Sequence, residues 1–203
     1  MKTLKGNTPP LYYQYKDIVY SKIAQMNLID NIPGSDRVGG KEDLSSDNIK
    51  LSLHRLFKYC INPITTAFGR DNIALTSVYR NKEVNKILKG VENSQHIFGY
   101  AADIVLTNNE PSSKLFNWCR FNLPEYHQLI WEYPERGIYL PSESENIPFS
   151  WIHISYIKGD NYKTNSVSST DPKIHKAYED EKTFYINNFT HKISTANQLL
   201  LEE

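Results

Sequence analysis

The stretch SQHIFGYAADIV, residues 94–105, sets a histidine, a glycine and an aspartate directly before an apolar run. The run AADIVL has the length and content of a β-strand, so the strand would carry Asp103 and the preceding loop would carry His96. Gly99 allows the tight backbone turn that such a loop needs, and the small alanines beyond it leave the approach uncrowded. The stretch therefore predicts a loop imidazole and a strand carboxylate that face a common point.

Two later runs, QLIWEY at 128–133 and WIHISY at 151–156, are also typical of strands. Successive side chains on a strand point to opposite faces. Each of the three strands would then bury one apolar face and present a single ionisable group on the other. If the strands share a sheet, Asp103, Glu132 and His153 gather on one side of it.

The rest of the chain adds helices around these strands. The expected elements are a helix from about 45 to 64 that Pro63 bends or ends, a strand at 72–80, a short helix between an Asn81 cap and Gly90, and a helix at 111–122. The pattern predicts an α+β fold: a small, mostly antiparallel sheet with flanking helices.

Three regions are expected along the chain: an N-terminal extension at 1–17, a catalytic domain at 18–158, and an appendage at 159–203. The appendage begins as a polar linker and continues as a C-terminal helix from about 173, with a ragged apolar stripe. That helix would dock on its own domain or serve self-association or contact with a larger partner.

The composition limits the classes of partner. Lys plus Arg equals Asp plus Glu at 23 each, which argues against general binding to nucleic acid or anionic membranes. No apolar run approaches the 18 or so residues of a membrane span. The N-terminus lacks the apolar core of a secretory signal, so synthesis in a host cytoplasm is expected. Cys60 and Cys119 are expected to be buried, reduced thiols, with a disulfide or a metal role as alternatives.

The ionisable groups suit a catalytic zinc site, which takes three protein ligands and leaves a fourth position for water. His96, Asp103 and His153 supply two imidazoles and one carboxylate. Glu132 would act as general base for the water. Arg80, at the end of its strand, would stabilise the oxyanion.

These residues fall in a pattern that resembles a known family. SQHIFGYAAD matches S-x-H-x-x-G-x-A-x-D, the signature of the zinc D-alanyl-D-alanine carboxypeptidases and their relatives, the M15 peptidases. TSVYRNKEVN, residues 76–85, looks like the S-G-Y-R-S-x-E-V-N block upstream of it, and the two later strand runs resemble the downstream blocks. The order and spacing are similar to the branch found in bacteriophages and prophages, over about residues 18–158.

The resemblance implies the fold of the hedgehog and D,D-peptidase group, with peptidoglycan stem peptides as substrates. It also implies Zn2+ as cofactor, held by the ligand trio already named. Arg80 would face the scissile carbonyl, and Ser77, Tyr79 and Ser94 would contribute to substrate binding.

Two departures from the family pattern bear on activity. Val78 stands where the upstream block usually has glycine, which would tighten the space beside Arg80. Ser150 stands three residues before the expected ligand His153, where other branches of the family carry the catalytic glutamate. Either Glu132 supplies the base from a neighbouring strand, or the base is missing and Glu132 is an ordinary solvated residue. Arg80 has a structural alternative as well, a salt bridge to a glutamate such as Glu83.

Three functional hypotheses follow. The first is a zinc metallopeptidase of phage origin that acts on the bacterial cell wall, either as a D,D-carboxypeptidase or as an endolysin-type endopeptidase, at lysis or at entry. The second is a catalytically silent structural or wall-binding protein of a virion that keeps the fold. The third is a signalling-type relative that binds partners through its zinc face.

Overall fold

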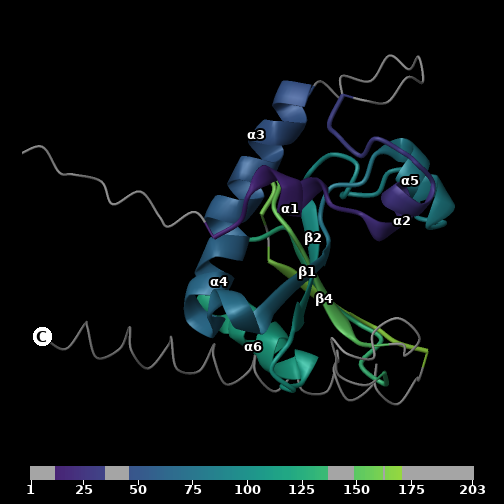
Figure 1. The fold of residues 1–203 in the computed structure, drawn as a ribbon. Coiled ribbons are helices and arrows are strands. Elements are labelled where there is room, and N and C mark those ends of the chain that lie inside the picture. The colour runs from purple at the N-terminus through teal and green to yellow at the C-terminus, as the bar shows by residue number, and fades with distance from the viewer. Residues whose placement is uncertain (1–11, 35–45, 137–148, 162, 171–203) are drawn as a thin grey trace, which may run out of the picture.

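A five-stranded sheet in the order β1-β2-β4-β3-β5 organises the chain. The computed structural model describes residues 12–34, 46–136, 149–161 and 163–170 (Figure 1). The strands are β1 (Ile73–Ser77), β2 (Ala101–Leu106), β3 (Gln128–Glu132), β4 (Trp151–Ser155) and β5 (Thr164–Ser168). Four of these strands lie where the apolar alternation predicts them, with ends that differ by a few residues at most.

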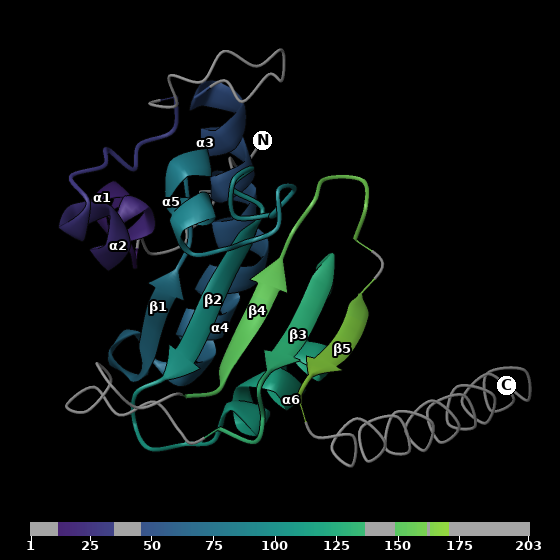
Figure 2. The same ribbon diagram turned by 90° about the vertical axis from the view of Figure 1, so that its right-hand side faces the viewer.

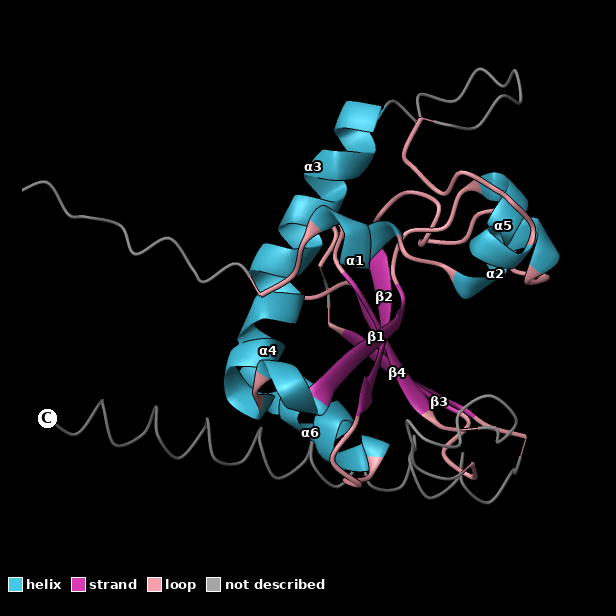
Figure 3. Cartoon of the chain, viewed as in Figure 1, coloured by secondary structure: helices cyan, strands magenta, loops and turns pink. Residues whose placement is uncertain are grey.

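The helices form two groups. The helical elements are α1 (Tyr15–Val19), α2 (Lys22–Met26), α3 (Ser46–Leu56), the π-helix η1 (Phe57–Ile61), α4 (Asn62–Phe68), the 3-10 helix η2 (Arg70–Asn72), α5 (Lys82–Ile87) and α6 (Ser112–Asn122). Figures 1 and 3 show α3, α4 and α6 together on one side of the sheet. Figure 2 looks onto the opposite face, with α1, α2 and α5 near one end of β1 and β2. Among the described residues, no helix combines the length and apolar content that crossing a membrane requires.

The long helical segment continues past Pro63 instead of ending there. The Asn62 N–H bonds to the carbonyl of Phe57, five residues back, which makes the π-turn of η1. Pro63 follows directly as the second residue of α4, so its ring, which would clash with the carbonyl of a regular α-turn, meets the wider π-turn instead. The π-turn therefore lets a proline stand within an otherwise continuous helix.

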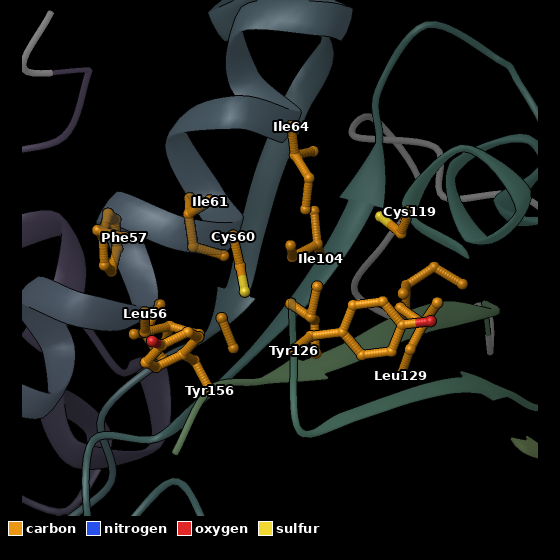
Figure 4. Packing of buried hydrophobic residues seen from close by; sticks show 14 of the residues in the cluster. Leu56, Phe57, Cys60, Ile61, Ile64, Ile104, Cys119, Tyr126, Leu129 and Tyr156 are labelled. Atoms are coloured by element: carbon orange, nitrogen blue, oxygen red, sulfur yellow. The ribbon is translucent and has the colours of Figure 1, made fainter. Parts of the chain in front are cut away.

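The core lies between these helices and one face of the sheet. It includes residues from α3 through α4, from α6 and from all five strands, with Leu56, Cys60, Ile61, Ile64, Ile104, Cys119, Tyr126 and Leu129 all fully buried (Figure 4). Both cysteines are free, which confirms the expectation of buried thiols. Burial raises the pKa of both thiols, so neither is a reactive thiolate.

The strand register decides which side chains share the other face. Asp103 pairs directly with His153 across β2 and β4, and His153 pairs with Ile130 of β3. Directly paired residues point to the same face, and Glu132 lies two positions beyond Ile130. Asp103, Glu132 and His153 therefore lie on one face, as the alternation of the three runs predicts.

Two sequence-based expectations about the sheet were wrong. The sheet is mixed instead of mostly antiparallel, because β5 runs parallel to β3 while the other three pairs are antiparallel. β5 itself falls in the segment expected to be a polar linker after residue 158. This strand buries only Val167 in the core, and an edge strand with so little buried surface gives no apolar alternation to detect.

The expected region boundaries also change. The folded part of the chain continues through β5, and α1 begins inside the segment 1–17 that was expected to be irregular. The helix expected from 173 lies outside the described residues. Each strand was expected to bury only one face, but β2 also buries Ala101 and Val105 on the face that carries Asp103.

Gly99 lets α3 pack against the loop before β2. Its backbone has φ of +69°, and a Cβ at this position would lie 2.9 Å from both the Ile49 carbonyl oxygen and the Leu53 Cγ. Residues other than glycine rarely adopt this φ, and real Cβ atoms do not approach a backbone oxygen so closely. The glycine of the motif is thus required by both conformation and space.

We expect Gly99→Ala to lower the free energy of unfolding by about 3 kcal/mol, through left-handed strain and displacement of α3. Gly159→Ala is the matched control, since Gly159 has φ of +83° with no heavy atom within 4 Å of a built Cβ. It should lose only the strain component, about 1 kcal/mol. Chemical denaturation of both variants measures the difference, and equal losses would contradict the close approach of α3.

Candidate metal centre

Turns in the loop before β2 hold His96 in place. The N–H of Ile97 donates to Ser94, that of Gly99 to His96 and that of Tyr100 to Gln95. The Arg80 N–H donates to the His96 carbonyl at 3.3 Å, which ties the loop to the end of β1. The His96 side chain is only 2% exposed, so its position is fixed from all sides.

The hydrogen bonds of His96 define which nitrogen is free. Its Nδ1 lies 2.7 Å from the Val78 carbonyl oxygen, which can only accept, so Nδ1 carries the proton and donates. Its Nε2 is then left with a lone pair and lies 3.3 Å from Asp103 Oδ2.

His153 is arranged in the same way from the opposite side. Its Nε2 lies 3.2 Å from Gln95 Oε1, and its Nδ1 lies 3.0 Å from Asp103 Oδ1. With the proton on Nε2 and donated to the amide oxygen of Gln95, Nδ1 keeps its lone pair towards Asp103. One nitrogen from each ring and one carboxylate thus converge, while the other ring nitrogens are held by acceptors.

The converging atoms fit a zinc ion. The ligand atoms of His96, Asp103 and His153 lie within 4.8 Å of one another. Zinc binds imidazole and carboxylate at about 2.0–2.2 Å with tetrahedral geometry, which sets neighbouring donors roughly 3.3 Å apart. The observed contacts of 3.0 and 3.3 Å are close to that spacing. Acceptors on the distal ring nitrogens are the usual surroundings of metal-bound histidines.

The electrostatics favour the protonation states that metal binding needs. Burial alone would raise the pKa of the Asp103 carboxyl, but the two neighbouring imidazoles outweigh it and hold that pKa well below its usual range. Burial lowers the pKa of His96, against the attraction of Asp103. The site therefore presents an ionised carboxylate beside a neutral His96.

Glu132 lies beside this trio. Its carboxylate is near enough to His153 and Asp103 for their charges to influence its pKa, and it accepts a hydrogen bond from the Ser168 hydroxyl of β5. Burial is the largest influence and raises the pKa of Glu132 above its usual value. Glu132 is therefore a half-buried carboxylate on the metal face instead of a solvated strand residue.

Ser150 points away from the trio. Its Oγ accepts from Trp131 Nε1 at 2.8 Å and donates to the Glu132 carbonyl at 3.0 Å, and its own carbonyl accepts from the Ser112 hydroxyl of α6. The residue is only 3% exposed. A glutamate at this position would enter the packed layer under α6. The presence of serine here therefore does not deprive the metal face of a carboxylate.

Arg80 lies next to the trio with hydrogen-bonding capacity to spare. Its charge influences the pKa of His96, and its own pKa is lowered by burial against the attraction of Asp103. Within the described ranges, its buried Nε has no hydrogen-bond partner, and no ion pair joins it to Glu83. The guanidinium thus keeps at least one donor, Nε, that is unused within the described ranges.

The three expected substrate-binding residues have different positions. Ser77 pairs with Asp103 after a β-bulge in β1, so it lies beside the trio. Ser94 is buried in the turn that carries His96, which suits support of the loop. Tyr79 is 1% exposed within the core, and its backbone bonds to Ile18 and Asn31, so the structure does not bring it to the open face.

Sequence reasoning missed two supporting groups, the Gln95 side chain and the Val78 carbonyl. Gln95 occupies an unspecified position of the motif, and a backbone carbonyl leaves no mark on sequence at all. Val78 was noted only as a departure from glycine, yet its carbonyl orients His96. Only the partners across the fold identify these two roles.

Comparison with known proteins agrees with this geometry. Residues 45–132, less than half of the chain, match the peptidase M15 family model. The matched segment carries Arg80, His96, Asp103 and Glu132 and ends before His153. A search of curated proteins found no match. The family match supports an M15 peptidase, and so a metallopeptidase, a class that is typically zinc-dependent.

We expect Gln95→Leu to weaken zinc binding by about 10- to 100-fold, because the side chain keeps its size but no longer accepts from His153 Nε2. Gln95→Glu retains an acceptor and serves as the matched control, with affinity at or above that of the wild type. Competition with a chromophoric chelator measures both dissociation constants. Equal affinities in the wild type and Gln95→Leu would show that Gln95 does not orient His153.

Proposed function

We propose that the protein is a zinc-dependent peptidase that hydrolyses peptide bonds in peptidoglycan stem peptides. One observation carries the proposal: two oriented imidazole nitrogens and the Asp103 carboxylate converge within bonding reach of one cation, on the face that also holds Glu132. The M15 family match over the central segment supports the reaction class, and the resemblance of the motif blocks supports the substrate class.

His96, Asp103 and His153 are the proposed ligands, and the fourth position is left for water and substrate. A zinc ion held there would lower the pKa of a bound water towards about 7 and polarise the scissile carbonyl. Because both distal ring nitrogens are held by acceptors, the ligands need little reorganisation to bind.

Glu132 is the proposed general base. It accepts the proton of the attacking water and delivers it to the nitrogen of the leaving amine. Its raised pKa suits this task, since a carboxylate with a pKa nearer neutrality is a stronger base towards the water and is still acidic enough to protonate an amine. The Ser168 hydroxyl fixes one side of the carboxylate.

Arg80 is the proposed stabiliser of the oxyanion. A buried cation with a free donor acts more strongly on developing negative charge than an exposed one, because little water screens it. Ser77, beside Asp103, is the proposed substrate-facing hydroxyl, and Ser94 is proposed to support the loop that carries His96.

The finer assignment has two forms, release of a terminal D-alanine and endolysin-type cleavage within the stem or cross-bridge. A phage origin, with a role at lysis or entry and association with a virion, belongs to the same proposal and follows from the resemblance of the motif blocks to the phage branch. The hypothesis of a silent virion protein was motivated by Ser150 and Val78. Ser150 faces the helical layer and the Val78 side chain is buried in the core, so neither side chain occupies the metal face.

Incubation of the purified protein with peptidoglycan tests the activity. We expect release of D-alanine or of new amino termini that a chelator abolishes. Glu132→Gln should lower the rate by about 10²- to 10⁴-fold while the zinc content stays at one ion per chain. Glu83→Gln, a change at an exposed glutamate of α5, is the control. Unchanged activity in Glu132→Gln would remove Glu132 as base, and no product from the wild type under any condition would favour the silent protein.

Metal content tests the ligand set independently of activity. We expect His96→Ala to lose stoichiometric zinc, because the carboxylate and one imidazole that remain bind too weakly to survive gel filtration. His54→Ala, at an exposed position of α3, should keep its zinc. Elemental analysis of both variants provides the measurement, and full occupancy in His96→Ala would contradict the assignment.

A further inference from the structure

An aromatic and cationic cluster lies beside Glu132 and has no part in the mechanism above. We call Tyr133, Arg136, Phe149 and Trp151 the Arg136 platform. The Arg136 guanidinium lies over the Tyr133 ring at 3.7 Å from its centroid and 6.0 Å from that of Trp151. The Tyr133 and Trp151 rings are 5.2 Å apart, and Phe149 lies 6.2 Å from Trp151.

The strand register places this platform on the metal face. Trp151 pairs directly with Glu132, and it lies two residues before His153 on β4, so the three side chains share that face. Figure 2 shows the end of β3 and the start of β4 side by side at the sheet end away from α5. The platform therefore continues the active face beyond the proposed base.

A tight turn holds the guanidinium in position. Tyr133 has φ of +50°, a strained conformation for a non-glycine residue, and its N–H donates to the Ser168 carbonyl. The Arg136 N–H donates back to the Tyr133 carbonyl at 2.9 Å. The chain thereby folds Arg136 over the ring of Tyr133.

The charge of Arg136 is left available for a ligand. The neighbouring Glu135 carboxylate is already bound by the Ser169 hydroxyl and by the Thr170 N–H and hydroxyl. Within the described ranges, Arg136 makes no ion pair, although its charge helps to lower the pKa of Glu132. A guanidinium that lies over a ring keeps its N–H edge free, and that edge suits bidentate binding of a carboxylate.

We propose that the Arg136 platform binds the free C-terminal carboxylate of the residue that leaves, so that the enzyme acts on peptide ends as a carboxypeptidase. This inference rests on the proposed peptidase function. One residue separates the scissile carbonyl from that carboxylate, about 3.8 Å. A charge-assisted hydrogen bond adds about 3 Å. The cation is then needed roughly 7 Å from the scissile carbonyl, a span similar to the two-residue rise along β4 from His153 to Trp151, beside which the Arg136 guanidinium lies.

The decisive comparison uses a stem-type peptide ending in D-alanyl-D-alanine and the same peptide as its C-terminal amide. We expect the wild type to favour the free acid over the amide in kcat/KM by about 10- to 100-fold, which is typical of a charged hydrogen-bonded contact. In Arg136→Gln this ratio should fall towards one, mainly through KM for the acid. Arg136→Lys, which keeps the charge but not the bidentate edge, should give an intermediate ratio, and Arg55→Gln on α3 should leave it unchanged.

A binding measurement separates failure of this subsite from failure of the proposed function. Quenching of tryptophan fluorescence in zinc-loaded Glu132→Gln protein reports binding of each peptide without cleavage. We expect Glu132→Gln protein to bind the acid more tightly than the amide, and the double variant that also carries Arg136→Gln to lose this preference. That result supports the platform even if the wild type cleaves neither peptide. Equal binding of acid and amide, or an acid preference that survives Arg136→Gln, overturns it, and cleavage of both peptides would then leave the peptidase function standing.

Discussion

The contact between the Asp103 carboxylate and two imidazoles is the constraint on which the rest of the structure depends. A buried carboxylate is costly unless a cation compensates it, and His96 and His153, from two different elements, each turn one ring nitrogen towards Asp103. Burial lowers the pKa of His96, while the neighbouring imidazoles outweigh burial and hold the pKa of Asp103 well below its usual range. These protonation states leave three electron-pair donors facing one point, which suits a divalent cation.

The surrounding fold serves that contact through a division between the two faces of one sheet. The face under α3, α4 and α6 holds the core, while the opposite face holds the ionisable groups. Gly99 lets α3 pack against the loop that carries His96, so the helical layer also fixes the site. The same division explains Ser150, which bonds to Trp131 on the core side and leaves the metal face to Glu132.

β3 and β5 extend the site beyond the metal ligands. Ser168 of β5 binds the Glu132 side chain through its hydroxyl and the Tyr133 N–H through its carbonyl. A strand of mostly polar residues thereby supports both the proposed base and the turn that presents Arg136. The proposed base and the proposed carboxylate subsite therefore lie side by side at this part of the sheet, and the positions of Glu132 and Trp151 follow from strand register.

Local periodicity in the sequence determined β1 to β4, the main helices and the opposition of Asp103, Glu132 and His153 to the apolar face of their own strands, because alternation along a strand depends only on near neighbours. The motif likewise determined that His96 and Asp103 belong together. The tertiary structure alone decided that β5 is a strand, that Ser150 faces the core, and that Gln95 and the Val78 carbonyl orient the imidazoles. Each of these depends on a partner far along the chain, and such contacts are set by the packing of the whole fold and not by any local pattern.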